Sequence, residues 1–217
     1  PEVVDYYRAV APVLLGHLRG RALTVRRHRG ALELRVPLAL VAAPGRPTAV
    51  VFDLEPGAPA TVVESCEVAL RLEGMFRHLG LQSFAKTSGS NGLEVYVPLG
   101  AGPVTFARTQ AFARMVAELL ARDEPELVVA GVTPRPRPGR VGVDWTGNHE
   151  QRTTMAAYSL RAWAVSTPVD WDEVRRTRAS GRPEELAFDA GQVLDRVAER
   201  GDLFAPLLSL RQELPAF

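Results

Sequence analysis

Residues 49–56 read Ala49-Val-Val-Phe-Asp-Leu-Glu-Pro56, an apolar run that acquires two acidic residues just before a turn rich in Pro and Gly. Side chains alternate between the two faces of a β-strand, so we expect Asp53 and Glu55 to project from one face at the strand's end. Two carboxylates in this arrangement can share a hard divalent cation, because Mg²⁺ and Mn²⁺ prefer oxygen ligands. The alternative is a solvated strand end, where acidic pairs are common.

The hydrophobic periodicity on either side of this strand predicts an α+β fold, with strands in hairpins and helices between them. We expect strands over residues 23–27, 32–38, 48–54, 83–87, 93–98, 127–132 and 140–145. Helices are expected over residues 3–18 with a kink or break at Pro12, and over 61–79, 106–122, 190–199 and 203–214, with a further helix starting near 168. These elements predict a single domain over 1–217, with a core at about 30–165 and a helical C-terminal tail at about 168–217.

Composition narrows the class of protein. Of the 217 residues, 46% are hydrophobic and 24% are charged, which excludes wholesale disorder. The longest mostly apolar stretch, residues 36–43, is far shorter than the roughly 20 residues that span a bilayer, so no membrane partner is expected. Cys66 is the only cysteine, which excludes an intrachain disulfide and a cysteine-based zinc site. We expect a cytoplasmic protein, and because residue 1 is Pro we expect a processed or trimmed product.

A second motif is the Gly-rich segment Phe84-Ala-Lys-Thr-Ser-Gly-Ser-Asn-Gly-Leu-Glu-Val-Tyr-Val97, which holds the only lysine of the chain. Backbone amides in such a turn can cradle phosphates, and Lys86 and Ser88 can add donors. The motif is not a Walker A loop, because the lysine precedes the glycines and no helix opens directly after Gly92. The alternative is a simple β-turn.

A third motif, Val141-Gly-Val-Asp-Trp-Thr-Gly-Asn148, places Asp144 at the end of another expected strand, with Arg152 and Arg161 downstream. Asp144 is thus a candidate third carboxylate, although it can equally cap a turn while the arginines remain surface charge. Three carboxylates for one or two metals, a Gly-rich turn for a triphosphate and an arginine for charge neutralisation together suit metal-assisted nucleotidyl transfer.

In combination these motifs resemble the archaeo-eukaryotic primase superfamily, and within it the polymerase domain of bacterial ATP-dependent DNA ligase D, from non-homologous end joining. The resemblance implies a primase-polymerase fold with mixed and antiparallel central sheets flanked by helices. The matching stretches follow the family order over nearly the whole chain: Val3-Val-Asp-Tyr-Tyr-Arg-Ala-Val-Ala-Pro-Val-Leu-Leu15, Gly30-Ala-Leu-Glu-Leu34, Val51-Phe-Asp-Leu-Glu-Pro-Gly57, Lys86-Thr-Ser-Gly89 with Gly92-Leu93, Val143-Asp-Trp145, Ala157-Tyr-Ser-Leu-Arg161 and Val165-Ser-Thr-Pro-Val-Asp-Trp-Asp-Glu-Val174.

The resemblance also implies roles for individual residues. Asp53, Glu55 and Asp144 would be the catalytic residues and would bind Mn²⁺ or Mg²⁺. The incoming NTP or dNTP would be held by Arg35, Lys86, Ser88, Gly89, Arg152 and Arg161. The implied partners are DNA at gaps or broken ends, nucleoside triphosphates, a DNA ligase and an end-binding protein, with nucleoid association following from DNA binding.

The chain departs from the family pattern at several of these positions. The second acid of the first motif is usually Asp and here is Glu55, and the family usually has histidines where Arg35 and Glu94 stand. Glu94 would repel a triphosphate unless it joined the metal shell. A long family segment that helps bind the DNA end is replaced here by Arg27-His-Arg-Gly30.

These departures leave more than one function open. A working primase-polymerase competes with a degenerate paralogue that keeps the fold and binds nucleic acid or a repair partner. A metal-dependent nuclease and a pure protein-interaction module are further alternatives, and the former is disfavoured because hydrolysis needs no triphosphate cradle. Two other sets of residues are candidates for nucleic-acid contact, with solvated loops and core packing as the alternatives: the arginines between Arg19 and Arg29, and the tryptophans Trp145, Trp163 and Trp171.

Overall fold

The computed structural model describes residues 2–28, 30–100, 102–131 and 138–217, and it confirms the α+β prediction. Within that part of the chain, six strands form a central sheet in the order β11-β4-β5-β3-β7-β6. All neighbours in it are antiparallel except β6 and β7. Its strands are β3 (Ala49–Pro56), β4 (Phe84–Thr87), β5 (Leu93–Pro98), β6 (Val128–Ala130), β7 (Val141–Asp144) and β11 (Pro168–Val169).

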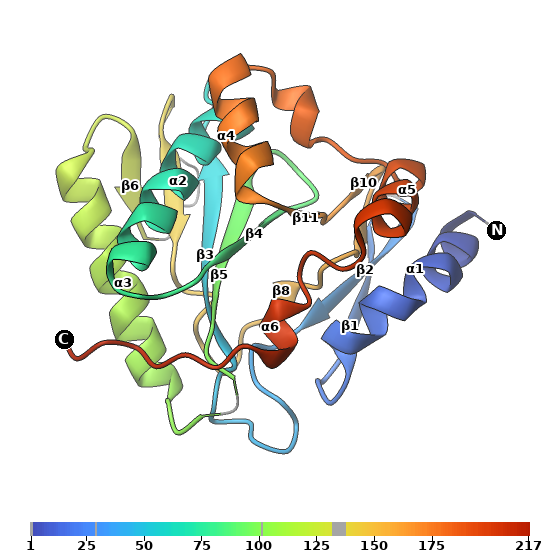
Figure 1. Cartoon of the computed structure of the whole chain (residues 1–217), viewed down its shortest axis with the longest axis horizontal. Coiled ribbons are helices and arrows are strands. Elements are labelled where there is room, and N and C mark those ends of the chain that lie inside the picture. Colours follow the sequence, from blue (N-terminus) through green and yellow to red (C-terminus); the bar gives the residue numbers. More distant parts are fainter. Residues whose placement is uncertain (1, 29, 101, 132–137) are drawn as a thin grey trace.

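Two long helices cover one face of the central sheet (Figure 1). They are α2 (Val62–His78) and α3 (Phe106–Asp123), each starting at a threonine N-cap. Thr61 forms a capping box with Glu64, which satisfies amide groups that have no partner inside the helix. Phe52 of β3 packs against Phe76 of α2, and Phe76 packs in turn against Phe112 of α3, so the larger hydrophobic core lies on this side.

The opposite face of the central sheet carries a second, smaller layer (Figure 1). A three-stranded antiparallel sheet runs in the order β1-β2-β8, and β9 pairs with β10 as a separate hairpin. Val51 of β3 packs into the core of this layer with Val10 of the N-terminal helix. The elements of the layer are α1 (Glu2–Leu18), β1 (Thr24–His28), β2 (Ala31–Val36), β8 (Thr154–Met155), β9 (Leu160–Arg161) and β10 (Ala164–Val165).

The C-terminal part of the chain packs on both layers. Val174 of α4 lies in the core under α2, whereas Val193 of α5 lies in the core beside α1. The elements here are α4 (Trp171–Ser180), η1 (Pro183–Leu186), α5 (Ala190–Arg200) and α6 (Pro206–Ser209). The predicted tail at 168–217 therefore contributes to two hydrophobic cores.

Two predictions about helices need correction. Of the kink or break expected at Pro12, the break is wrong, because α1 runs continuously from Glu2 to Leu18 through Pro12, and the kink stays a prediction. The helix expected over 203–214 is a single turn, α6, and residues 210–217 have no regular structure. Pro206 starts that turn, and the extended conformation of Leu210 ends it. Among the described residues, no helix combines the length and the apolar composition needed to cross a membrane.

Candidate active site

A cleft of about 430 Å³ opens between the central sheet and the smaller layer. One wall is the end of β3 and β7, and the other wall comes from β2, β8 and β9. Of the residues proposed from sequence, eight line this cleft or its neighbouring turn, and Lys86 does not line it. The eight are Arg35, Asp53, Glu55, Ser88, Gly89, Asp144, Arg152 and Arg161, of which Gly89 lies against Arg161.

Four charged side chains form a row across the central sheet. In the strand register Lys86 lies opposite Glu94, Glu94 opposite Asp53, and Asp53 opposite Asp144. Directly opposite residues of antiparallel strands share a face, so these side chains project from the same side of the sheet. The row ends in two aspartates side by side, and sequence reasoning placed both at strand ends without showing that the strands were neighbours.

Asp144 is held in place by its own turn. Its Oδ1 atom accepts hydrogen bonds from the backbone amide and the hydroxyl of Thr146, both at 2.7 Å. This is the Asx-turn pattern that ends a strand. Thr146 thus fixes the carboxylate that lies opposite Asp53 in the strand register.

Burial and neighbouring carboxylates together change the acidity of Asp53. Although its side chain lines the cleft, desolvation by the surrounding protein is the main cause that raises the pKa of Asp53 to about 8. The carboxylate of Glu94 acts in the same direction, the ammonium of Lys86 opposes it, and Asp144 and Glu55 add smaller contributions. A group with this pKa carries a proton that a divalent cation can displace.

The carboxylates of the cleft suit a divalent cation that takes its remaining ligands from a bound substrate. Glu55 is exposed and lies two residues beyond Asp53 on the same face of β3, opposite Gly142. Among the described residues, no group of three or more His, Cys, Asp or Glu converges as a complete metal site. Mg²⁺ is usually bound by one or two carboxylates together with substrate phosphates, so the Asp53–Asp144 pair fits such an ion. The role of Glu55 as a third ligand stays a prediction.

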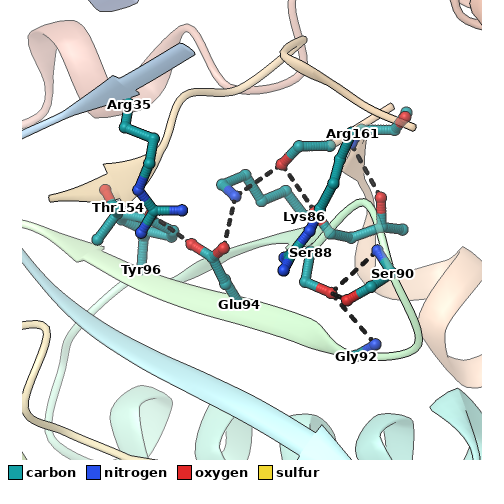
Figure 2. A network of polar contacts seen from close by, with 12 residues as sticks. Arg35, Lys86, Ser88, Ser90, Gly92, Glu94, Tyr96, Thr154 and Arg161 are labelled. Carbon is teal, nitrogen blue, oxygen red and sulfur yellow. Dashed lines mark hydrogen bonds and ion pairs between the residues drawn. The ribbon is translucent and has the colours of Figure 1, made fainter. Parts of the chain in front are cut away.

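Lys86 is buried, with 1% of its surface exposed, and its ammonium group reaches the carboxylate of Glu94 (Figure 2). Its Nζ atom lies 3.0 Å from Oε1 of Glu94 and donates a hydrogen bond to Oγ of Ser166 at 2.7 Å. The Tyr96 hydroxyl donates to Oε2 of Glu94 at 2.6 Å. Burial and the adjacent Glu94 hold the pKa of Tyr96 well above its usual range, which keeps the phenol a donor.

This network changes two expectations. Lys86 neutralises Glu94 and does not point into the cleft, so the chain's only lysine does not contact a triphosphate in this arrangement. Glu94 is charge-compensated and does not present a free negative charge to the cleft. Positive charge at the cleft therefore comes from arginines.

Two of those arginines share one buried carboxylate. Glu33, 5% exposed, lies 2.8 Å from Nη1 of Arg35 through Oε1 and 3.8 Å from Nε of Arg161 through Oε2. Arg35 also donates to the carbonyl oxygen of Thr153 at 2.6 Å. Arg35 is thus held by hydrogen bonds and Arg161 by a longer ion pair, and both arginines line the cleft that the two aspartates also line. The third cleft arginine, Arg152, is exposed.

The Gly-rich segment is the predicted hairpin turn, and Ser88 stabilises it from inside. Its hydroxyl oxygen accepts from the amides of Gly92 at 3.2 Å and Ser90 at 3.3 Å (Figure 2). Gly89 has φ +69°, which favours glycine, and a Cβ there would lie 3.2 Å from Cβ of Arg161. A Cβ on Gly92 would lie 2.2 Å from the carbonyl oxygen of Leu54, so only glycine fits.

Sequence reasoning missed three structural contributors to the site: Glu33, Tyr96 and Asn148. The side chain of Asn148 accepts from the Val51 amide at 2.9 Å and donates to the Val51 carbonyl at 2.7 Å, so it continues the sheet ladder where β7 has ended. Glu33 was visible as a lone acid between apolar residues of a predicted strand. No local signal distinguishes Tyr96 or Asn148.

The basic clusters divide into structural and exposed groups. Arg21 donates to the carbonyls of Pro37 and Leu38 and to the Thr48 hydroxyl, so it has a structural role, and a phosphate contact by this residue stays a prediction. Other members, Arg19, Arg26 and Arg27, are exposed, and Arg29 lies outside the described residues.

Comparison with known proteins points to one family. Residues 28–204 match the family model described as LigD, primase-polymerase domain. The chain is 34% identical, over 95% of its length, to the multifunctional non-homologous end joining protein LigD of Mycolicibacterium smegmatis, and covers 33% of that protein. A LigD of Pseudomonas aeruginosa is 35% identical over 75% of this chain, which covers 20% of that protein. The chain thus spans a third or less of these relatives.

A solved structure agrees with the sequence comparisons. The polymerase domain from Mycobacterium tuberculosis ligase D in complex with DNA superposes with a TM-score of 0.81 at 29% sequence identity. The match covers 97% of this chain and 92% of that one. The predicted fold family is therefore confirmed in three-dimensional structure as well as in sequence.

Proposed function

Because the chain belongs to the LigD primase-polymerase domain family, we propose that it adds nucleotides to DNA ends or gaps during non-homologous end joining of double-strand breaks. The relatives are named for non-homologous end joining and for a polymerase domain, and we infer the same activity and repair process for this chain. It makes the chain a nucleotidyltransferase that uses NTPs or dNTPs.

One observation carries this proposal: acidic and basic residues face each other across the same cleft. Asp53 and Asp144 lie side by side on the central sheet, and Arg35, Arg152 and Arg161 line the cleft from the other layer. A nucleoside triphosphate is the kind of ligand that suits both walls, because its phosphates bind arginines while its reacting phosphate approaches a cation at the carboxylates.

We propose that Asp53 and Asp144 hold Mn²⁺ or Mg²⁺, with Glu55 as an additional ligand. The chemistry such an ion supplies when bound is neutralisation of charge on the transferred phosphate and activation of the attacking hydroxyl. Asp53 contributes by releasing its proton, and Thr146 keeps Asp144 oriented.

The arginine wall would orient the triphosphate. Arg35 and Arg161 are fixed by Glu33, so they can contact phosphate oxygens with little loss of side-chain entropy. Ser88 and Gly89 shape the turn beside Arg161, and Lys86 acts through Glu94.

We propose DNA as the macromolecular partner, with a DNA ligase and an end-binding protein as further partners in repair. The solved relative is a complex with DNA, and in this chain Arg19, Arg26 and Arg27 are exposed near the edge strand β1. If these arginines contact phosphates, affinity for duplex ends should fall steeply with added salt. A flat response would remove that contact.

The site is tested by binding of a fluorescent nucleoside triphosphate with and without Mn²⁺. The variants Asp53→Asn and Asp144→Asn should each lose the Mn²⁺-dependent part of the affinity. Asp123→Asn, the same change at an exposed helix end, should bind like the parent chain. Equal Mn²⁺-dependent affinity in all four proteins would contradict the proposed metal site.

A non-catalytic module that binds nucleic acid or a repair partner is the second candidate. The buried Lys86–Glu94 pair favours it, because the pair removes the only lysine from the cleft. This candidate predicts DNA binding without any nucleotide incorporation.

A further inference from the structure

Trp163 stands out among the aromatic residues because 84% of its surface is exposed. The other two tryptophans are partly buried: Trp171 donates a hydrogen bond to the Ser83 carbonyl at 2.9 Å, and Trp145 lies under the guanidinium of Arg114. An indole left almost entirely in water is unusual, since tryptophan normally buries most of its large apolar surface. Its exposed indole is therefore available to a ligand.

The turn that carries Trp163 is firmly held. Ala162 and Trp163 connect β9 to β10, with Arg161 paired opposite Ala164. The next pair of the hairpin, Leu160 and Val165, is buried at 6% and 1% exposure. Ala162 adopts φ 54°, a left-handed conformation that a residue with a Cβ adopts at an energetic cost. The indole of Trp163 is thus carried by a short, strained turn whose two strands are fixed by a buried pair.

This turn lies at the edge of the proposed nucleotide cleft. Arg161 lines the cleft and is anchored by Glu33, and the backbone at Gly89 packs against its Cβ. Figure 2 shows the Arg161 side chain above the Ser88–Gly92 turn. Trp163 follows two residues later, so its Cα lies within about 7 Å of that of Arg161. The exposed indole therefore belongs to the residue two positions beyond a cation that lines the cleft.

We propose that Trp163 is a stacking platform for a nucleobase at the mouth of the cleft. Every base offers a π-face, and aromatic residues bind bases by stacking with little dependence on sequence. Arg161 would contact a phosphate while the indole stacks on the adjacent base. The inference rests on the proposed function, because that function brings nucleotides to this cleft. The base belongs either to an unpaired DNA strand or to the incoming nucleotide.

The test compares Trp163→Ala and Trp163→Phe in the full chain, with Val41→Ala, an exposed apolar residue elsewhere, as the matched control. The probes are a short oligothymidylate, ATP with Mn²⁺, and inorganic triphosphate with Mn²⁺. Circular dichroism establishes that each variant is folded. Loss of a stacking contact predicts roughly five- to hundredfold weaker binding of a base-bearing probe by Trp163→Ala.

The pattern across probes decides the source of the base. A loss confined to oligothymidylate assigns the stack to an unpaired strand, and a loss confined to ATP assigns it to the incoming nucleotide. In either case Trp163→Phe should retain most of the affinity, and inorganic triphosphate should bind all variants equally. Unchanged binding of both base-bearing probes, or equal losses in Ala and Phe variants, would overturn the proposal. An absence of primer extension by the parent chain would count against the proposed function and leave these binding results intact.

Discussion

The ammonium nitrogen of Lys86 lies 3.0 Å from a carboxylate oxygen of Glu94, and both side chains are buried between the central sheet and the smaller layer. Removing one member of such a pair leaves an uncompensated buried charge. We therefore expect Lys86→Met to lower the free energy of unfolding by about 3–5 kcal/mol. Urea unfolding followed by circular dichroism measures this loss.

The double variant Lys86→Met/Glu94→Gln should lose less than the sum of the single variants, with a coupling of about 1–3 kcal/mol. The exposed pair Arg114–Glu118 is the matched control, and its coupling should stay below about 1 kcal/mol. Additive losses at Lys86 and Glu94 would show that the ion pair is not the stabilising element.

The pKa of Asp53 predicts a dependence of stability on pH. In the folded chain the pKa of this carboxyl is raised to about 8, whereas an unperturbed aspartate, as in the unfolded chain, has a pKa of 3.8. Between these values the folded state binds more protons than the unfolded state, so the free energy of unfolding should fall as pH rises. Asp53→Asn should remove this contribution. Thermal unfolding of both proteins from acid to mildly alkaline pH checks it.

The same proton links pH to cation affinity. Because Mn²⁺ binds the ionised carboxylate, its apparent affinity should rise with pH until the pH passes about 8. Titration of the parent chain with Mn²⁺ at several pH values provides the measurement. An affinity that does not change over this range would argue against Asp53 as a ligand.

Glu33 is predicted to act on the nucleotide through Arg35 and Arg161. Glu33→Gln removes the negative charge that pairs with both guanidinium groups. We expect roughly tenfold weaker triphosphate binding, because this corresponds to the free energy of one charge-assisted hydrogen bond. In primer extension the change should raise KM more than it lowers kcat. Glu118→Gln, which breaks an exposed arginine pair, serves as the control.

Gly92 is predicted to tolerate no side chain. The methyl group of Gly92→Ala would meet the Leu54 carbonyl at 2.2 Å, so β3 and the turn must shift, at a cost of at least about 2 kcal/mol. Gly74→Ala is the control, because a methyl group inside α2 meets no atom within 4 Å. That variant should gain about 0.5–1 kcal/mol in helix stability. Equal stability of the two variants would contradict the close approach at Gly92.

Much of the fold was predictable from local patterns. The strand at 93–98 and the helix from 106 followed directly from their periodicity and bounding turns. The prediction for 203–214 failed because its apolar spacing is helical, although only Pro206–Ser209 form a helical turn and the chain after it has no regular structure, with Leu214 buried in the larger core. Tertiary contacts decide such a segment, and they leave no periodic signal.

The site was only partly predictable for a related reason. Asp53 and Asp144 were identifiable as acids at strand ends, but their adjacency depends on the order of strands that are far apart in sequence. Lys86 was correctly singled out as unusual, yet its partner Glu94 appeared from sequence to be a defect of the triphosphate site. Only the register of β4 and β5 shows that each residue compensates the other.

The most direct test of the account is primer extension on gapped DNA with Mn²⁺ and all NTPs or dNTPs. The parent chain is compared with Asp53→Asn/Asp144→Asn, and Asp123→Asn controls for the change of charge. We predict nucleotide incorporation by the parent chain and by Asp123→Asn, and none by the double variant. A folded parent chain that binds the gapped DNA yet incorporates no nucleotide would contradict the account.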